Sequence, residues 1–343
     1  MTARVRTLVV ATITVALTLQ SGLAVNAQAP APAKPATPTA ATPPSAAPKP
    51  TVIPPRRFAS AEDAVQALVS AVRAGDVNAM VRVLGSDGRA LVVSGDPVLD
   101  QRARERFVAE YDAGHSLVGT GETTVLHVGR DDWPFPIPLV KDGDRWRFDA
   151  RRGRDEILAR RIGRNELYTI QTCLAYVDAQ REYYTQDRNG DGILEYAKQF
   201  ASTPGARDGL YWPTQPGERQ SPLGELVVRA RAEGYRRETA GHTPYHGYYY
   251  RILTAQGPSA PDGAYDYVVR GHMLAGFALV AFPAQYGNSG VMTFLVNHDG
   301  IVYQKDLGPR TREIAMAMRA FDPDPTWTKA ETPEITATNP IRP

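Results

Sequence analysis

The chain has 343 residues and a formal net charge of only +2, with 39 basic and 37 acidic side chains. A charge so close to neutral argues against a dedicated nucleic-acid-binding protein, which would carry a basic surface. The single cysteine, Cys173, excludes an intrachain disulfide. Stability must therefore come from packing, or from packing together with a bound ion.

Residues 1–27 have the order of a cleavable secretory signal. Arg4 and Arg6 precede an apolar run that starts at Leu8, and small residues ending at Ala27 follow. The run is about 12 residues long, which is short of the roughly 20 that a membrane-spanning helix needs. We therefore expect a periplasmic or secreted protein, cleavage near Ala27 and no integral membrane segment in the mature chain. The alternative is a signal that stays uncleaved and serves as an anchor.

Residues 28–57 are almost entirely Ala, Pro, Thr and Lys. Such a composition offers nothing to bury, and its prolines favour an extended, solvated chain. We expect a disordered linker here, and a second disordered segment at the tail, residues 328–343.

Residues 58–152 are predicted to form an α+β domain. Ser60 and Asp63 make a capping box before apolar residues at helical spacing, a second helix follows, and a third covers about 99–111. The period then changes to two, which indicates a sheet. The expected strands are 115–120, 122–130, 134–141 and 144–149. Because Pro134, Pro136 and Pro138 lack N–H groups, the third of these should be an edge strand.

Residues 153–327 are predicted to combine a long helix with an antiparallel meander, again an α+β arrangement. The helix should run from about Arg154 to Tyr184, with Gly163 as a candidate break. Its apolar stripe consists of Leu167, Ile170, Leu174, Val177 and Tyr184, and Cys173 beside the stripe is most simply a small buried hydrophobe. The remaining expected elements are a short helix from Ser221 to Gly234, strands near 248–253, 273–282, 291–297 and 301–304, and a final helix over 311–321.

Several sequence segments together resemble a family of exported bacterial proteins known as domain of unknown function 2950. The segments, in order, are WPFPIPLV at 133–140, WRFD at 146–149, GRNEL at 163–167, DGLYWP at 208–213, GYYYRIL at 247–253, AQG at 255–257, YG at 286–287, GVMTF at 290–294 and KDLG at 305–308. The resemblance covers nearly everything from Phe58 to Trp327. It implies an extracytoplasmic bacterial protein and supplies no catalytic residues.

Each half also resembles a known fold in its pattern of elements. Helices followed by a curled antiparallel sheet, over 58–152, are similar to the cone-shaped NTF2-like fold. The second half, with a long helix, a Gly-rich loop and a meander, is similar to the globular body of pilins and pseudopilins. It lacks a prepilin cleavage motif, so we expect a pilin-like body used as a soluble domain and no filament.

The sharpest local signal is DRNGDGILE at 187–195. It matches the first half of an EF-hand-type calcium loop, with oxygen side chains at positions one, three and five, glycine at six and an apolar residue at eight. The candidate ligands of Ca²⁺ are Asp187, Asn189, Asp191, the main chain of Ile193, and Glu195. Lys198 stands where a bidentate acid is expected, and the alternative is a plain Asn-Gly-Asp-Gly turn.

Two further groups of residues are candidates for function. For a hydrolase acting on cell-wall or glycan substrates, the acid–base group would be His242, His246, Asp266 and His272; no HExxH or CxxC motif is present. For contact with a glycan or peptide, the aromatic candidates are Tyr211, Trp212, Tyr245, Tyr248 and Tyr249, which equally suit packing of a sheet on the long helix.

Residues 145–164 contain eight arginines. Outside the cytoplasm they could meet phosphates of lipids or of the cell wall, but a solvated face of a strand and a helix explains them as well. The composite prediction is a non-catalytic binding or scaffolding protein of the cell envelope, stabilised by calcium. Its partner would be an envelope component or a small ligand, with a hydrolase as the alternative.

Overall fold

The computed structural model describes residues 52–236 and 243–331. The predicted signal, nearly all of the linker, most of the tail and His242 lie outside the described residues. Within the described residues, no helix combines the length and the apolar character needed to cross a bilayer. The described chain contains helices and antiparallel sheets, so the α+β class is confirmed.

The first half begins with helices whose starts are capped by side chains, at Ser60 as the sequence predicts. Ser60 Oγ accepts the main-chain N–H of Asp63, and the Asp76 carboxylate accepts that of Ala79. The elements are α1 (Ala61–Arg73), α2 (Val77–Leu84), the 3-10 turn η1 (Ser86–Gly88), α3 (Arg89–Val92) and α4 (Pro97–Ala113). α4 extends the predicted third helix by two residues at each end.

A five-stranded antiparallel sheet follows, in the order β1-β2-β4-β5 with β3 paired to β2. The strands are β1 (His115–Thr120), β2 (Thr123–Val128), β3 (Trp133–Pro134), β4 (Leu139–Asp142) and β5 (Arg145–Phe148). The single strand predicted over 134–141 is wrong, since residues 135–138 belong to no strand. The missing N–H groups of Pro136 and Pro138 explain the interruption, and β3 pairs with β2 alone.

A hydrophobic core fills the space between these helices and the sheet. Its fully buried members include Ala64 on α1, Leu126 on β2, Leu139 on β4 and Phe148 on β5. Inward-facing residues thus alternate along β2, as the predicted period of two requires.

Helix α5 (Ala150–Tyr184) runs for 35 residues without interruption, and the predicted break at Gly163 is wrong. The predicted apolar stripe is also wrong at its end, because Tyr183 is buried whereas Tyr184 is 37% exposed. A buried polar residue determines which face of α5 points inward. Gln180 donates to the carbonyl of Ala197 and accepts the N–H of Ala197, so the face centred on it is the inward one.

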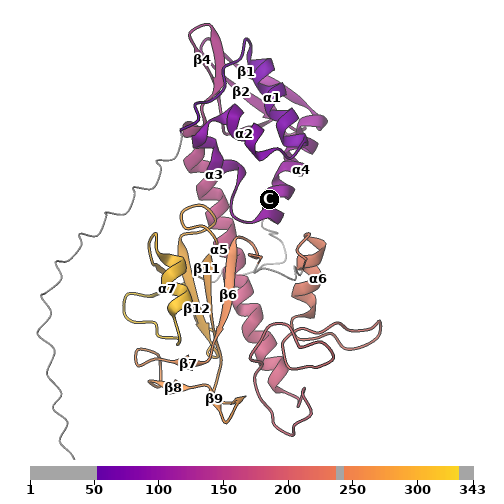
Figure 1. Cartoon of the computed structure of the whole chain (residues 1–343), viewed down its shortest axis with the longest axis vertical. Coiled ribbons are helices and arrows are strands. Elements are labelled where there is room, and N and C mark those ends of the chain that lie inside the picture. Colours follow the sequence, from indigo (N-terminus) through magenta and orange to yellow (C-terminus); the bar gives the residue numbers. More distant parts are fainter. Residues whose placement is uncertain (1–51, 237–242, 332–343) are drawn as a thin grey trace, which may run out of the picture. The chain divides into compact units, whose positions relative to one another are not determined.

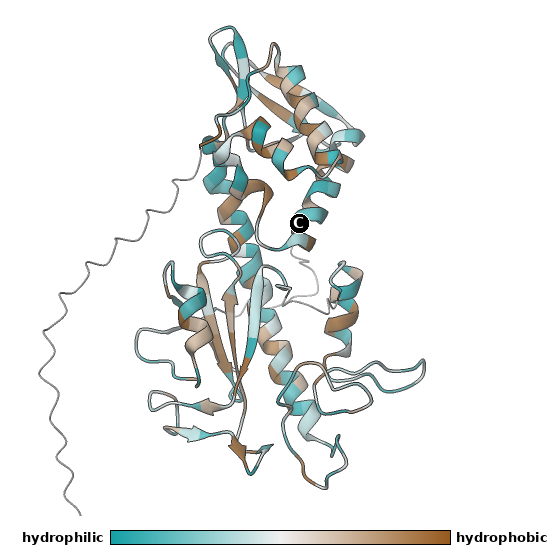
Figure 2. Cartoon of the chain, viewed as in Figure 1, coloured by the Kyte–Doolittle hydropathy of each residue, from teal (hydrophilic) through white to brown (hydrophobic). Residues whose placement is uncertain are grey.

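The second sheet consists of β14 (Thr328–Lys329), β13 (Val302–Asp306), β12 (Met292–Asn297), β11 (Ala278–Pro283) and β6 (Tyr248–Leu253), in this order. It carries α5 on one face and α7 (Thr311–Ala317) on the other (Figure 1). On β6, the Tyr250 hydroxyl points to Thr169 of α5, and the adjacent Arg251 donates to the carbonyls of Ala315 and Met318 at the end of α7. Neighbouring residues of a strand point to opposite faces. β11 and β12 are therefore buried on both sides, and Figure 2 shows their apolar character.

The remaining elements of the second half are α6 (Gly224–Ala232), β7 (Ala255–Gln256), β8 (Tyr265–Asp266), β9 (Val268–Val269) and β10 (His272–Met273). The predicted helix over 311–321 is wrong at its C-terminal end, where Met318 leaves helical geometry and Arg251 donates to the carbonyls of Ala315 and Met318. β14 pairs with β13 just past the predicted boundary at residue 327. The NTF2-like and pilin-like resemblances, and the boundary between residues 152 and 153, stay predictions.

Candidate metal centre

The loop from Asp187 to Glu195 is a compact turn held by its own carboxylates. The Asp187 carboxylate accepts the N–H groups of Gly190 at 2.7 Å and Gly192 at 2.9 Å. These bonds, the one from Gly192 first, lower the pKa of the Asp187 carboxyl. Gly190 and Gly192 have φ values of 80° and 85°, which favour glycine.

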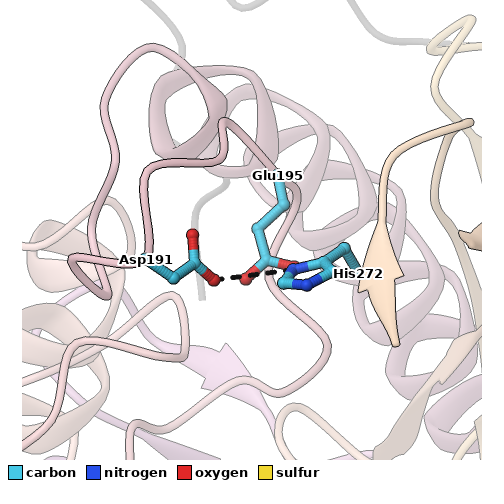
Figure 3. A group of neighbouring side chains, drawn as sticks. All are labelled: Asp191, Glu195 and His272. Carbon is cyan, nitrogen blue, oxygen red and sulfur yellow. Dashed lines mark hydrogen bonds and ion pairs between the residues drawn. The ribbon is translucent and has the colours of Figure 1, made fainter. Parts of the chain in front are cut away.

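Three side chains converge beside this loop (Figure 3). His272 Nδ1 lies 3.2 Å from Glu195 Oε2 and 3.5 Å from Asp191 Oδ2. One ligand atom from each of the three lies within 4.8 Å of the others. Glu195 is only 6% exposed, so its carboxylate is held away from bulk water. We refer to Asp191, Glu195 and His272 as the acidic cluster.

The fold brings these residues together through one main-chain bridge. Tyr196 donates its N–H to the carbonyl of Met273 at 2.8 Å, which joins the end of the loop to β10. The N–H of Met273 in turn donates to Glu195 Oε2 at 3.3 Å. The turn before β10 is tight, with Arg270 and Gly271 both at positive φ. His272, at the first position of β10, is thus placed against the loop.

The amide of Asn189 holds the two carboxylates of the acidic cluster together. Its Nδ2 donates to Asp191 Oδ2 at 2.8 Å and to Glu195 Oε1 at 2.7 Å. Carboxylate oxygens suit a hard divalent cation, and an imidazole nitrogen shifts the preference toward zinc and similar ions. Lys198, in place of the twelfth EF-hand ligand, donates to the carbonyl of Gly271.

The predicted calcium ligands therefore have different roles in the structure. Asp191 and Glu195 belong to the acidic cluster, Asn189 joins them, and Asp187 binds main-chain N–H groups. Ile193 donates its N–H to Asp191 Oδ1 at 2.9 Å. The sequence pattern predicts His272 only as a member of the acid–base group and does not connect it to the loop, because Glu195 and His272 lie 77 residues apart in the chain.

The predicted acid–base residues that the structure describes do not contact the same side chains. His246 is buried and its Nε2 lies 3.0 Å from Glu233 Oε2, whereas His272 contacts Asp191 and Glu195. Asp266 is exposed on β8, and His242 lies outside the described residues.

The aromatic residues predicted to contact a ligand differ in how deeply they are buried. Tyr248 is fully buried and donates its hydroxyl to the carbonyl of Met292. Trp212 is 6% exposed, and the guanidinium carbons of Arg188 and Arg207 lie 5.8 Å and 5.6 Å from its ring centroid. Such positions favour packing over contact with a ligand. The partly exposed aromatic candidates are Tyr211, Tyr245 and Tyr249.

Comparison with protein-family models identifies the family of this chain. The model of the family described as protein of unknown function (DUF2950) matches residues 55–330, and the chain belongs to this family. No curated protein and no solved structure matches the chain.

Proposed function

We propose that this protein is an exported, non-catalytic binding or scaffolding module whose second half is stabilised by one divalent cation at the acidic cluster. The observation that carries the proposal is the convergence of Asp191, Glu195 and His272 from two segments far apart in sequence. An ion there would add a further link between the 187–195 loop and the hairpin of β9 and β10, beside the bonds of Tyr196 and Glu195 with Met273.

The chemistry of the cluster supports a cation. Two carboxylates repel each other when both are charged, and a divalent ion would remove that repulsion while neutral His272 offers the lone pair of Nδ1. The order of side chains in the loop favours Ca²⁺, as the sequence predicts, whereas the imidazole favours Zn²⁺. We propose a divalent site of mixed oxygen and nitrogen ligands, and the experiment distinguishes the two ions.

The non-catalytic role is supported by the state of the candidate reactive groups. Burial raises the pKa of the Cys173 thiol to about 12, so this thiol does not ionise at neutral pH. His246 and His272 have separate partners and do not form one acid–base pair.

The test is the thermal melt of the mature chain with Ca²⁺, with Zn²⁺ and with a chelator. An ion at 100 times its dissociation constant adds about 2.7 kcal/mol to the free energy of unfolding, so the midpoint should rise by several degrees. The Glu195→Gln and His272→Gln variants should lose that rise, and Asp266→Asn, which removes an exposed acid from β8, should keep it.

The possible outcomes distinguish Ca²⁺ from Zn²⁺ and decide whether the proposed stabilising role holds. A rise with Zn²⁺ that depends on His272 identifies the mixed-ligand site. A rise with Ca²⁺ that survives His272→Gln but not Glu195→Gln identifies the loop alone. If neither ion moves the midpoint of the parent chain, the loop is a plain turn and the stabilising role is wrong.

A further inference from the structure

The first strand of the first sheet lies at its edge and has one side without a partner strand. β1 pairs with β2 over all of its residues, from His115 to Thr120. In an antiparallel pair, residues alternate between bonding to the partner strand and pointing their N–H and C=O groups away from it. Among the described residues, no main-chain group outside β2 bonds to the main chain of β1. Every second residue of β1 therefore offers its main chain to a further strand.

The other edges of the two five-stranded sheets are covered or short. At β5, Trp146 exchanges main-chain bonds of 2.8 Å and 2.9 Å with Phe58, which precedes α1. On β6, Tyr248 exchanges such bonds with Tyr245, and no residue of the strand is exposed. β14 has two residues, one of them a lysine. All but one of the residues of β1 are exposed, and the strand carries no Lys, Arg, Asp, Glu or Pro to protect its edge.

β1 also leaves apolar side chains uncovered on both faces of the sheet. Leu117 lies opposite Leu126, which is fully buried, yet Leu117 itself is only half-buried. Val118 points to the other face and is 48% exposed. The hydrophobic core of the first half therefore ends at β1, where two apolar side chains lie beside unpaired main-chain groups. A further strand at this edge would cover both side chains.

We propose that β1 pairs with β1 of a second copy of this chain, antiparallel and about a two-fold axis at Val118. Such an axis makes the two sheets continuous and places Val118 opposite its own copy. Ser116 then lies opposite Thr120 of the second copy, and hydroxyl pairs of this kind are favourable across strands. Leu117 lies opposite Gly119, whose missing side chain leaves room for it.

The composition of β1 favours its own copy as the partner strand. Because β1 carries no acidic residue, lysine or arginine, this pairing sets no like charges of the strand against each other. One pairing also covers Leu117 and Val118 in both chains at once. A single pair of short strands is a small interface, so we expect a dimer that dissociates on dilution. The dimer uses no residue of the acidic cluster and needs no cation.

The test is analytical ultracentrifugation of the mature chain over a range of concentrations, with a chelator present so that no cation contributes. The parent chain should pass from monomer to dimer as its concentration rises. Val118→Lys sets two like charges against each other at the axis and should raise the dissociation constant by about tenfold or more. Val228→Lys makes the same change at an exposed residue of α6 and should leave the dissociation constant unchanged.

A mixture of two variants tests the pairing itself and controls for loss of the fold. Val118→Lys and Val118→Glu should each stay monomeric, whereas their equimolar mixture should dimerise because opposite charges meet at the axis. Amide hydrogen exchange over 115–120 should slow at concentrations at which the parent chain dimerises.

Three results would count against the dimer. A parent chain that stays monomeric at every concentration overturns the proposal and leaves the edge to a strand of another protein. A dimer that survives Val118→Lys also overturns it, since the interface then lies elsewhere. A mixture of the Lys and Glu variants that stays monomeric overturns the pairing about Val118.

Discussion

The acidic cluster and the junction at Asp96 both hold carboxylates in buried or half-buried positions, but they satisfy them differently. At the acidic cluster, two carboxylates face one imidazole and share the amide of Asn189. At the Asp96 junction, one fully buried carboxylate caps α4 through the N–H groups of Val98 and Leu99 and also accepts the Tyr235 hydroxyl and the N–H of Gly247. The Asp96 carboxylate is therefore satisfied by four donors of the protein itself, whereas a cation would relieve the repulsion between Asp191 and Glu195.

The two regions also differ in how the chain builds them. The acidic cluster is set by a short loop and one hairpin, and its geometry depends on few main-chain bonds. The Asp96 junction joins the start of α4 to Tyr235 and Gly247, which lie 139 and 151 residues away in the chain. We expect substitutions at the Asp96 junction to lower the free energy of unfolding more than substitutions at the acidic cluster. The predictions that follow test that difference, from the largest effect to the smallest.

Replacing Asp96 by Ala should lower the free energy of unfolding by about 4 kcal/mol. The change removes a helix cap and leaves the Tyr235 hydroxyl and the N–H of Gly247 buried without an acceptor. Asp76→Ala is the matched control, since Asp76 caps α2 at an exposed position, and it should cost about 1 kcal/mol. Urea titration measures both, and equal costs would show that the Asp96 junction adds nothing beyond its cap.

Acidification should destabilise the turn at His246, whose N–H donates to Tyr235 of the Asp96 junction. Its pKa falls from 6.5 to about 4 on folding, so the unfolded chain takes up this proton first as the pH is lowered. Stability is full above pH 6.5 and declines between pH 6.5 and pH 4, by about 3 kcal/mol from this group. The groups facing His246 are Glu233, Arg102, Arg164, Arg229, Tyr168, Tyr235 and Tyr245.

Glu233 acts with the opposite sign, because a raised pKa makes the folded state hold its proton more tightly as the pH falls. The contribution of His246 is therefore the difference between the parent and a His246→Asn chain, since Asn tolerates positive φ. Urea titrations at pH 7 and pH 4.5 should show a smaller loss of stability in the variant. An equal loss in both chains would contradict the assignment to His246.

Two tyrosine hydroxyls allow a matched comparison of the regions. Tyr235 donates to the charged Asp96 and accepts the N–H of His246, whereas Tyr183, at the end of α5 before the 187–195 loop, donates to the neutral carbonyl of Arg207 at 2.8 Å. Tyr235→Phe should cost about 2 kcal/mol and Tyr183→Phe about 1 kcal/mol. Denaturant midpoints at neutral pH measure both costs. A larger cost for Tyr183→Phe than for Tyr235→Phe would contradict the greater stability of the Asp96 junction.

Local patterns predicted many of the elements. Capping residues and the change of period located α1, α2, β1, β2 and β5 closely, because these depend on neighbours within a few residues. The errors arose where distant contacts decide. The inward face of α5 is set by the bonds of Gln180 with Ala197, and the end of α7 by Arg251 from β6.

The candidate site likewise combines residues that a local pattern predicts with residues that only distant contacts bring in. The loop supplied Asp191 and Glu195 from its pattern alone, but His272 joins them only through pairing of Tyr196 with Met273. Nothing in the sequence around Asp96 signals that Tyr235 and Gly247 bind its carboxylate, since 139 and 151 residues separate them from it.

The most direct test of the central claim is the stoichiometry of divalent-ion binding by native mass spectrometry of the mature chain. We expect one Zn²⁺ or Ca²⁺ per parent chain after removal of excess metal, and one in the Asp266→Asn control. The Asp191→Asn, Glu195→Gln double variant should hold none. Retention of the ion by the double variant, or its absence from the parent chain, would contradict a cation site at Asp191, Glu195 and His272.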